Sequence, residues 1–242
     1  MLKRQQSTFV ILHGKSYLKF FKKVNYFLIK VIVLLLRIQI RFKKQGSLRF
    51  ISHHNLMKLF ERAIRRAEIP IKMSEGFNPR PKIIFPLALP VGIKGADEKL
   101  GLVLSECLSV DDVESRLKEQ LPEGIQIISV ELVSNRQSSI VSDITYRVKL
   151  KNEIVLETIK IEEFLSRSVI YTQRNGKKQL FDIKPSIINV TVNSEFITLD
   201  LKMTPKGMAR PEEVLSCLGL KVGKDYVITD MVRTRVNLSS SY

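Results

Sequence analysis

Apolar residues along positions 36–133 repeat first with the period of a strand and then with the period of a helix. The first strand pattern places apolar residues at every second position, Leu36, Ile38, Ile40 and Phe42. That period is typical of a strand with one buried face. A helical pattern follows from Ser52, and the whole segment has the order β-α-β-β-α-β. This order predicts a ferredoxin-like sheet with both helices on one face.

The boundaries of these elements follow from capping and helix-breaking residues. Ser52 is the expected N-cap of a helix that runs to about Ala67, because Pro70 cannot continue it. The other predicted elements are a buried strand over 83–89, a strand over 99–104, a helix from Ser109 or Val110 to Gln120, and a strand over 125–133.

A similar order of elements recurs after a polar, Ser-rich stretch. The predicted elements are a strand over 144–150, a helix within 155–168, a hairpin over 169–183 turning on Asn175-Gly176, a hairpin over 187–203 around Asn193-Ser194, a helix from Pro211, and a strand over 226–238. We therefore expect an α+β protein with tandem ferredoxin-like (βαββαβ) domains and antiparallel sheets. Domain 1 spans 36–133, the linker 134–142, and domain 2 143–242.

The net charge of +16 is confined to one part of the chain. Residues 1–86 hold 19 Lys and Arg against 3 acids, whereas residues 87–242 hold 21 of each sign. An ordinary solvated surface would spread its charge more evenly. The asymmetry favours a polyanionic partner, either nucleic acid or anionic lipid.

Residues 1–35 contain no acid, and from Tyr17 their apolar residues fall at helical spacing. This segment is a basic amphipathic helix, which suits a membrane surface or a polyanion, or a disordered tail, or the product of an upstream start codon chosen in error. Its apolar run, 26–36, is too short for a spanning helix, which needs roughly 20 residues. We expect no stable transmembrane insertion.

The helix after Ser52 and the loop after it carry the candidate binding residues. At 100° per residue the cations Lys58, Arg62, Arg65 and Arg66 share one side of the helix. His54 points with these cations, whereas His53 points with the apolar side and is expected to be packed or capping. Pro79 and Pro81 stiffen the loop over 76–82, although an ordinary tight crossover between strands would also explain them. The predicted RNA-binding residues are Lys44, Arg49, Lys58, Arg62, Arg65, Arg66, Asn78, Arg80 and Lys82.

The sequence lacks the motifs of most catalytic and cofactor-binding sites. Its two cysteines, Cys107 and Cys217, are too few for a zinc site, a disulfide framework or an iron–sulfur cluster, and they indicate a reducing, cytoplasmic setting. No P-loop or dinucleotide-binding fingerprint occurs. We expect no cofactor, no metal and no assigned catalytic residue. His54 is the one candidate general base, and no second acid–base partner accompanies it.

Residues 36–104 string together several short motifs: Lys44-x-Gly46, Arg49-Phe50-x-Ser52-His53, the helix over 56–67, Ser74-x-Gly76-Phe77-Asn78-Pro79, and Leu89-Pro90-x-Gly92. With these motifs the chain resembles the radical-SAM-linked proteins of unknown function (domain of unknown function 2344). The resemblance covers roughly 36–238 and is strong to about 133. The resemblance implies partnership with a radical SAM protein. Asn55 and His54 depart from the pattern, so a ligand role for His54 would not be a family role. The chain is also similar, more distantly, to tandem ferredoxin-like proteins that cut CRISPR repeat RNA.

Three functions are compatible with these features. The first is a non-catalytic RNA-binding accessory protein associated with a radical SAM enzyme, its partner being a structured RNA such as tRNA or rRNA. The second is a protein-interaction module that docks the radical SAM partner. The third is a metal-independent ribonuclease of the type that processes CRISPR repeat RNA, a reading that rests on likeness of fold and so confers no activity by itself. The basic helix and the stiff loop favour the first function.

Overall fold

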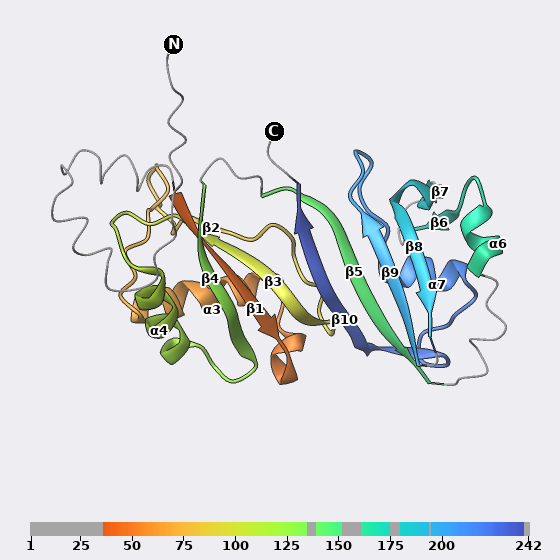
Figure 1. Ribbon diagram of the computed structural model, residues 1–242, viewed down its shortest axis with the longest axis horizontal. Coiled ribbons are helices and arrows are strands. Elements are labelled where there is room, and N and C mark those ends of the chain that lie inside the picture. The colour runs from red at the N-terminus through yellow and green to blue at the C-terminus, as the bar shows by residue number, and fades with distance from the viewer. Residues whose placement is uncertain (1–35, 135–138, 152–160, 175–179, 194, 240–242) are drawn as a thin grey trace, which may run out of the picture.

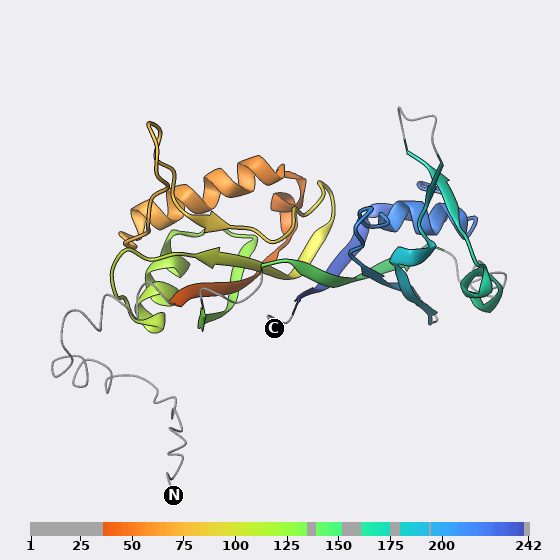
Figure 2. The ribbon, with the colours of Figure 1, turned by 90° about the horizontal axis from the view of Figure 1, so that it is seen from above.

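The computed structural model describes residues 36–134, 139–151, 161–174, 180–193 and 195–239, and it is a mixed α+β structure (Figure 1). One mostly antiparallel sheet runs through both halves of the chain, with neighbouring strands in the order β4-β1-β3-β10-β5-β9-β8. A short strand, β2, also pairs with β3. Figure 2 shows the helices α3 and α7 on the same side of this sheet.

The first half consists of β1 (Leu36–Lys44), α3 (His53–Arg66), β2 (Ile83–Ile84), β3 (Lys94–Leu102), α4 (Val110–Gln120) and β4 (Ile125–Ser134). A short 3-10 helix, Gly46–Phe50, joins β1 to α3. β1 lies between β3 and β4 and is antiparallel to both. Its residues Ile38, Ile40 and Phe42 are buried, which confirms the predicted buried face. Helices α3 and α4 cover that face and complete one hydrophobic core.

The predicted N-cap Ser52 is confirmed, and Ser109, one of the two residues predicted to start the second helix, is the N-cap of α4. The Ser52 hydroxyl accepts a hydrogen bond from the Asn55 amide at 3.2 Å, and the Ser109 hydroxyl accepts one from the Asp112 amide at 3.0 Å. These bonds satisfy amides that the first turn of a helix leaves without partners. Helix α3 ends at Arg66 and α4 ends at Gln120, within a residue of the prediction.

The predicted strand over 83–89 is wrong beyond its first two residues. Only Ile83 and Ile84 pair with β3, opposite Leu102 and Gly101. Pro86 has no amide hydrogen to continue the ladder, so the chain leaves the sheet. The other end of β3 pairs instead with β10, in parallel, at Val232↔Lys94 and Arg233↔Gly95. Strand β3 therefore begins at Lys94, five residues before the predicted start.

The second half consists of β5 (Val141–Leu150), α6 (Ile161–Ser166), β6 (Tyr171–Gln173), β7 (Leu180–Asp182), β8 (Ile187–Val192), β9 (Phe196–Lys202), α7 (Pro211–Cys217) and β10 (Tyr226–Leu238). A 3-10 turn, Lys184–Ser186, precedes β8. The pairings β6–β7 and β8–β9 confirm the two predicted hairpins. The turn residues Asn175 and Gly176, and the predicted helical residues 155–160, lie outside the described residues.

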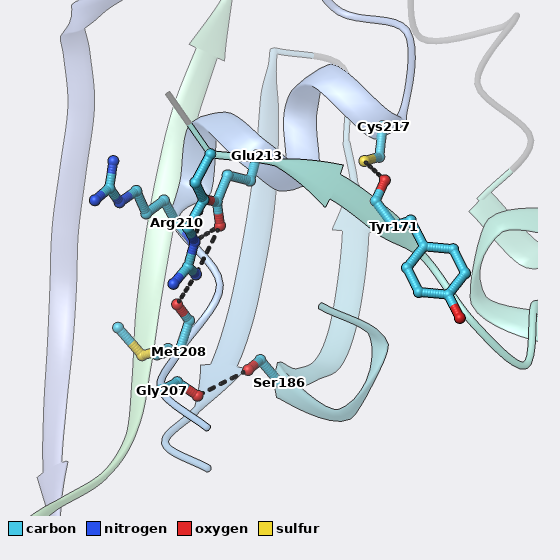
Figure 3. A network of polar contacts seen from close by, with 8 residues as sticks. Tyr171, Ser186, Gly207, Met208, Arg210, Glu213 and Cys217 are labelled. Carbon is cyan, nitrogen blue, oxygen red and sulfur yellow. Dashed lines mark hydrogen bonds and ion pairs between the residues drawn. The ribbon is translucent and has the colours of Figure 1, made fainter. Parts of the chain in front are cut away.

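The β6–β7 hairpin forms its own two-stranded sheet and is tied to α7. The Arg174 guanidinium donates to Glu213 Oε1 at 2.8 Å and to the Met208 carbonyl at 2.9 Å, and it lies 3.9 Å from the centre of the Phe181 ring. Figure 3 shows two further links, from Cys217 Sγ to the Tyr171 carbonyl at 3.7 Å and from the Ser186 hydroxyl to the Gly207 carbonyl at 3.4 Å. Arg174 thus fixes the hairpin and is not free for a ligand.

The two halves have separate hydrophobic cores but share more than a linker. The second core includes Leu89 and Ile93, which precede β3 in the first half. The sheet also continues from β3 into β10. The division at 134–142 stays a prediction, since residues 135–138 lie outside the described residues.

The predictions for the N-terminal segment 1–35 fall wholly outside the described residues. Within the described part of the chain, the helices are all too short or too polar to cross a membrane. Cys107 and Cys217 are both free thiols.

Candidate nucleic-acid interface

Helix α3 divides into a buried apolar face and an exposed cationic face, as the sequence predicts. Leu56, Phe60, Ala63 and Ile64 are buried against the sheet. The exposed cations Lys58, Arg62, Arg65 and Arg66 form what we call the cationic face of α3. Their spacing of three and four residues makes them neighbours on the helix surface. Because α3 packs on the sheet, this row of positive charges, which forms a ridge, has a fixed position.

Three of these cations have no acidic partner in the part of the chain that the structure describes. Among the described residues, no carboxylate lies within ion-pair distance of Lys58, Arg62 or Arg65. Arg66 differs, because its guanidinium donates to Gln120 Oε1 at 3.1 Å and to the Gln120 carbonyl at 2.7 Å. Arg66 thus links α3 to the end of α4. Lys58, Arg62 and Arg65 are the cations that remain available to an anionic ligand.

A shallow groove of ≈ 630 Å³ lies beside this ridge. Asn55, Lys58, Arg62 and Arg66 line the α3 side, and residues 120–122 line the α4 side. The groove is open and mixes polar with apolar groups. Such a depression offers donors to a phosphate and apolar surface to a sugar or base.

The second candidate element is a narrow loop over residues 72–82, which projects on the α3 side of the sheet (Figure 2). The Ser74 amide donates to the Arg80 carbonyl at 2.7 Å, and the Arg80 amide donates to Ser74 Oγ at 2.9 Å. The Lys82 amide closes the base on the Lys72 carbonyl at 2.8 Å. Asn78 and Arg80 are exposed and Lys82 is half-buried. The structure thus presents the loop residues that the sequence predicts.

Lys44 does not belong to this interface. Its side chain is fully buried, and its ammonium donates to the Ile51 carbonyl at 3.1 Å. Burial lowers the pKa of Lys44; the Glu98 carboxylate partly offsets this, and the nearby Arg233 guanidinium adds to the lowering. A buried ammonium cannot reach an RNA phosphate, so the prediction for Lys44 is wrong.

Arg49 lies at the margin of the interface. Its guanidinium stacks over the Phe50 ring at 4.8 Å, and the residue is half-buried. Its Nε atom is buried and has no hydrogen-bond partner among the described residues. A phosphate role for Arg49 stays a prediction.

The two histidines separate as the helical wheel predicts. His53 packs edge-on against Phe85, with ring centres 5.2 Å apart, and its Nδ1 atom is buried without a hydrogen-bond partner in the described part of the chain. Burial lowers the pKa of His53, and the positive charges of Lys44 and Arg233 add to that effect. His54 is exposed at the start of α3. His53 is a packed residue, and only His54 is accessible to a ligand.

Acidification is expected to weaken the fold through His53. Its folded pKa lies below its ordinary value of about 6.5, so between these two values the unfolded chain binds more protons than the folded one. Stability conferred by neutral His53 is present above this window and is lost as the pH falls through it. Urea midpoints at pH 7.5 and 5.5 should differ less for His53→Phe than for wild type, whereas His54→Phe should keep the wild-type difference. An unaltered difference in His53→Phe would contradict this assignment.

A buried charge cluster between β3 and β10 escaped the sequence prediction. Arg233, fully buried on β10, donates from Nε to Glu98 Oε1 at 2.8 Å and from its terminal nitrogen to Glu98 Oε2. It also donates to the Ala88 carbonyl at 3.0 Å. Desolvation lowers the pKa of Arg233, but the Glu98 carboxylate outweighs it and the pKa lies above its ordinary value. The cluster joins β3 of the first half to β10 of the second.

The local sequence around Glu98 explains how the carboxylate fits. Gly95 lies close by on the same strand, and a Cβ atom placed there would come within 2.5 Å of Glu98 Cγ. Glycine at this position leaves room for the Glu98 side chain. The described residues contain no group of three or more His, Cys, Asp or Glu side chains that could hold a metal ion.

The fold and this surface define a mixed α+β protein with an exposed cationic helix and a stiff cationic loop. The sequence model of a family described as "Uncharacterized protein conserved in bacteria (DUF2344)" matches residues 37–211. The chain belongs to this family, as the sequence resemblance indicates. No curated protein matches the chain.

Proposed function

We propose that this protein binds RNA as a non-catalytic accessory protein, and that the cationic face of α3 and the 72–82 loop hold the RNA phosphates. The observation that carries the proposal is the row Lys58, Arg62 and Arg65, exposed on one helix and without acidic partners among the described residues. Unpaired cations held in a row repel one another, and an anionic ligand relieves that repulsion. Phosphate contacts of this kind position RNA without reading its sequence.

The rigidity of the scaffold supports this function. Helix α3 is capped by Ser52, packed along one whole face and linked to α4 by Arg66. Two proline residues and the bonds between Ser74 and Arg80 stiffen the loop. Preorganised donors lose little entropy when they meet a phosphate.

We also propose that each half is a ferredoxin-like unit. In the second half the neighbouring strands follow the order β10-β5-β9-β8, and in the first half the order is β4-β1-β3 with β2 beside β3. If the separate β6–β7 hairpin is left out of the numbering, both orders read fourth, first, third, second, which is the order expected for a βαββαβ unit. In this arrangement α3 is the first helix of its unit and keeps its outer face free for RNA.

A second candidate function, docking of a radical SAM protein, has one observation in its favour. Among the described residues, strand β4 is at the edge of the sheet with β1 as its one neighbour, and its Ile128 and Leu132 side chains are exposed. An unpaired edge with exposed apolar residues is a template for pairing with another chain. RNA binding and partner docking use different surfaces, so one accessory protein can do both.

Crosslinking in cells tests the proposed function directly. The tagged protein is irradiated and isolated under denaturing conditions, attached RNA is sequenced, and attached proteins are identified. The proposal expects RNA in excess of that attached to a Lys58→Gln, Arg62→Gln, Arg65→Gln variant, with crosslinked peptides from α3 or the 72–82 loop. Recovery of a protein partner with no RNA above that of the variant would contradict RNA binding and favour docking.

A further inference from the structure

The tip of the 72–82 loop holds the most exposed aromatic residue among those that the structure describes. The relative exposure of Phe77 is 106%, against 52% for Phe50, the next most exposed phenylalanine in the described part of the chain. Burial of a phenylalanine ring is strongly favourable, so a ring fully in water is a surface on which something else can pack.

The loop holds this ring in a defined place. Paired bonds between Ser74 and Arg80 close the loop just below the tip, and a bridge between Met73 and Pro81 continues the closure. Gly76, directly before Phe77, has a φ of +119°, a conformation that a residue with a side chain rarely adopts. The backbone that carries Phe77 is therefore shaped before any ligand arrives.

The loop residues that flank the ring are mostly polar or cationic, and the apolar ones are Met73, Pro79 and Pro81. Asn78 and Arg80 follow it on the exposed part of the loop, Lys82 lies at the base, and Glu75 is the acid nearest in sequence. A ring that anchored a protein pocket would be expected among other apolar groups. A ring beside donors and cations matches a nucleotide, whose base stacks on an aromatic face while its phosphate meets the cations.

We propose that Phe77 stacks on an unpaired base of the RNA, so that the ligand class is RNA with a single-stranded loop, bulge or end. This inference rests on the proposed RNA-binding function and adds the part of the RNA that is recognised. Bases inside a duplex are already stacked on each other and cannot receive the ring without being displaced. The cationic face of α3 then holds phosphates on either side of the stacked base.

The test compares two RNA probes with the same number of phosphates, a hairpin with a single-stranded loop and a blunt duplex, by fluorescence anisotropy. Wild type is expected to bind the hairpin more tightly. Phe77→Ala should weaken hairpin binding by about 5- to 100-fold, the range for one base stacked on one aromatic side chain, and should leave the duplex affinity and the salt dependence unchanged. Phe77→Tyr should retain the hairpin affinity, because the ring remains.

Two control variants distinguish stacking from other contributions. Phe77→Leu keeps an apolar group but loses the ring, and it should bind as weakly as Phe77→Ala. Tyr171→Ala removes another exposed aromatic ring, on β6 in the second half of the chain, and should bind as wild type does. Hairpin binding by Phe77→Ala or Phe77→Leu that equals wild type would overturn the stacking role while leaving RNA binding in place. Absence of binding to both probes by wild type would overturn the proposed function itself.

Discussion

Replacing Glu98 with glutamine is expected to destabilise the fold by about 3–5 kcal/mol, the usual cost of removing one partner from a buried ion pair. The variant keeps the shape of the side chain and removes its charge. Arg233 and Lys44 are both fully buried, and Glu98 is the acid that the structure places against them. Without the carboxylate, two buried positive charges face each other in a region of low dielectric constant.

The neighbouring residue provides a matched control. Asp97 forms a two-point ion pair with Arg41, but there the arginine side chain is 38% exposed. This pair is partly exposed, and ion pairs in contact with water contribute less than buried ones, so Asp97→Asn should cost less than Glu98→Gln. Urea unfolding followed by circular dichroism measures both free energies. Equal costs for the two variants would contradict the structural role of the cluster.

A double variant tests whether the cost arises from the pair. Because Glu98 and Arg233 act on each other, Glu98→Gln combined with Arg233→Met should cost less than the sum of the two single changes. Urea unfolding of the wild type, the two single variants and the double variant measures this shortfall in the free energy of unfolding. The two residues connect β3 with β10. Strict additivity would show that the two side chains act independently.

Changing Lys58, Arg62 and Arg65 together to glutamine is expected to lower RNA affinity by about 100-fold at 0.1 M salt. Each phosphate contact with single-stranded RNA contributes about 0.7 to the slope of log affinity against log salt, which corresponds to roughly fivefold in affinity at that concentration. Glutamine has nearly the helix propensity of lysine and arginine, so α3 should stay folded. Anisotropy with the hairpin probe measures the loss.

The same change of charge elsewhere controls for net charge. Lys202, Lys206 and Lys224 are exposed in the second half of the chain and can be changed to glutamine in the same way. This control should lose less than about threefold in affinity, because distant surface charges are largely screened at 0.1 M salt. Losses of equal size in the two triple variants would show that the protein attracts RNA by its overall charge and has no defined interface.

Local patterns explain which parts of the molecule were predictable. Ser52, Ser109 and Pro211 mark helix starts that depend on one residue and its neighbours, and all three are confirmed. The helical-wheel prediction for α3 is also confirmed, since the burial of Leu56 and the exposure of Arg62 follow from one helical period. The strand over 83–89 failed after Ile84, because Pro86 has no amide hydrogen to continue the ladder. The pairing of β3 with β10 was not predictable either, because β10 lies far away in sequence.

The burial of Lys44 was predictable from the alternation of residues along β1, but its positive charge led to the prediction of an RNA-binding residue. Lys44 lies an even number of residues from the buried residues Ile38, Ile40 and Phe42, so alternation along β1 places it on the same face. In the same way, alternation along β3 places Glu98 on the same face as Leu100 and Leu102. Alternation placed both charges on the core face, although the sequence alone could not identify Arg233 as the partner, 135 residues from Glu98. Phe77 could be placed in a loop, but its complete exposure required the structure.

The salt dependence of RNA binding by the wild-type protein tests the central claim most directly. If about four of the cations on α3 and the 72–82 loop meet phosphates, log affinity for a single-stranded RNA should fall against log salt with a slope of about −3. That slope corresponds to a loss of about 60-fold between 50 and 200 mM salt. A flat response, or no measurable binding at 50 mM salt, would contradict the account of α3 and its loop as an RNA interface.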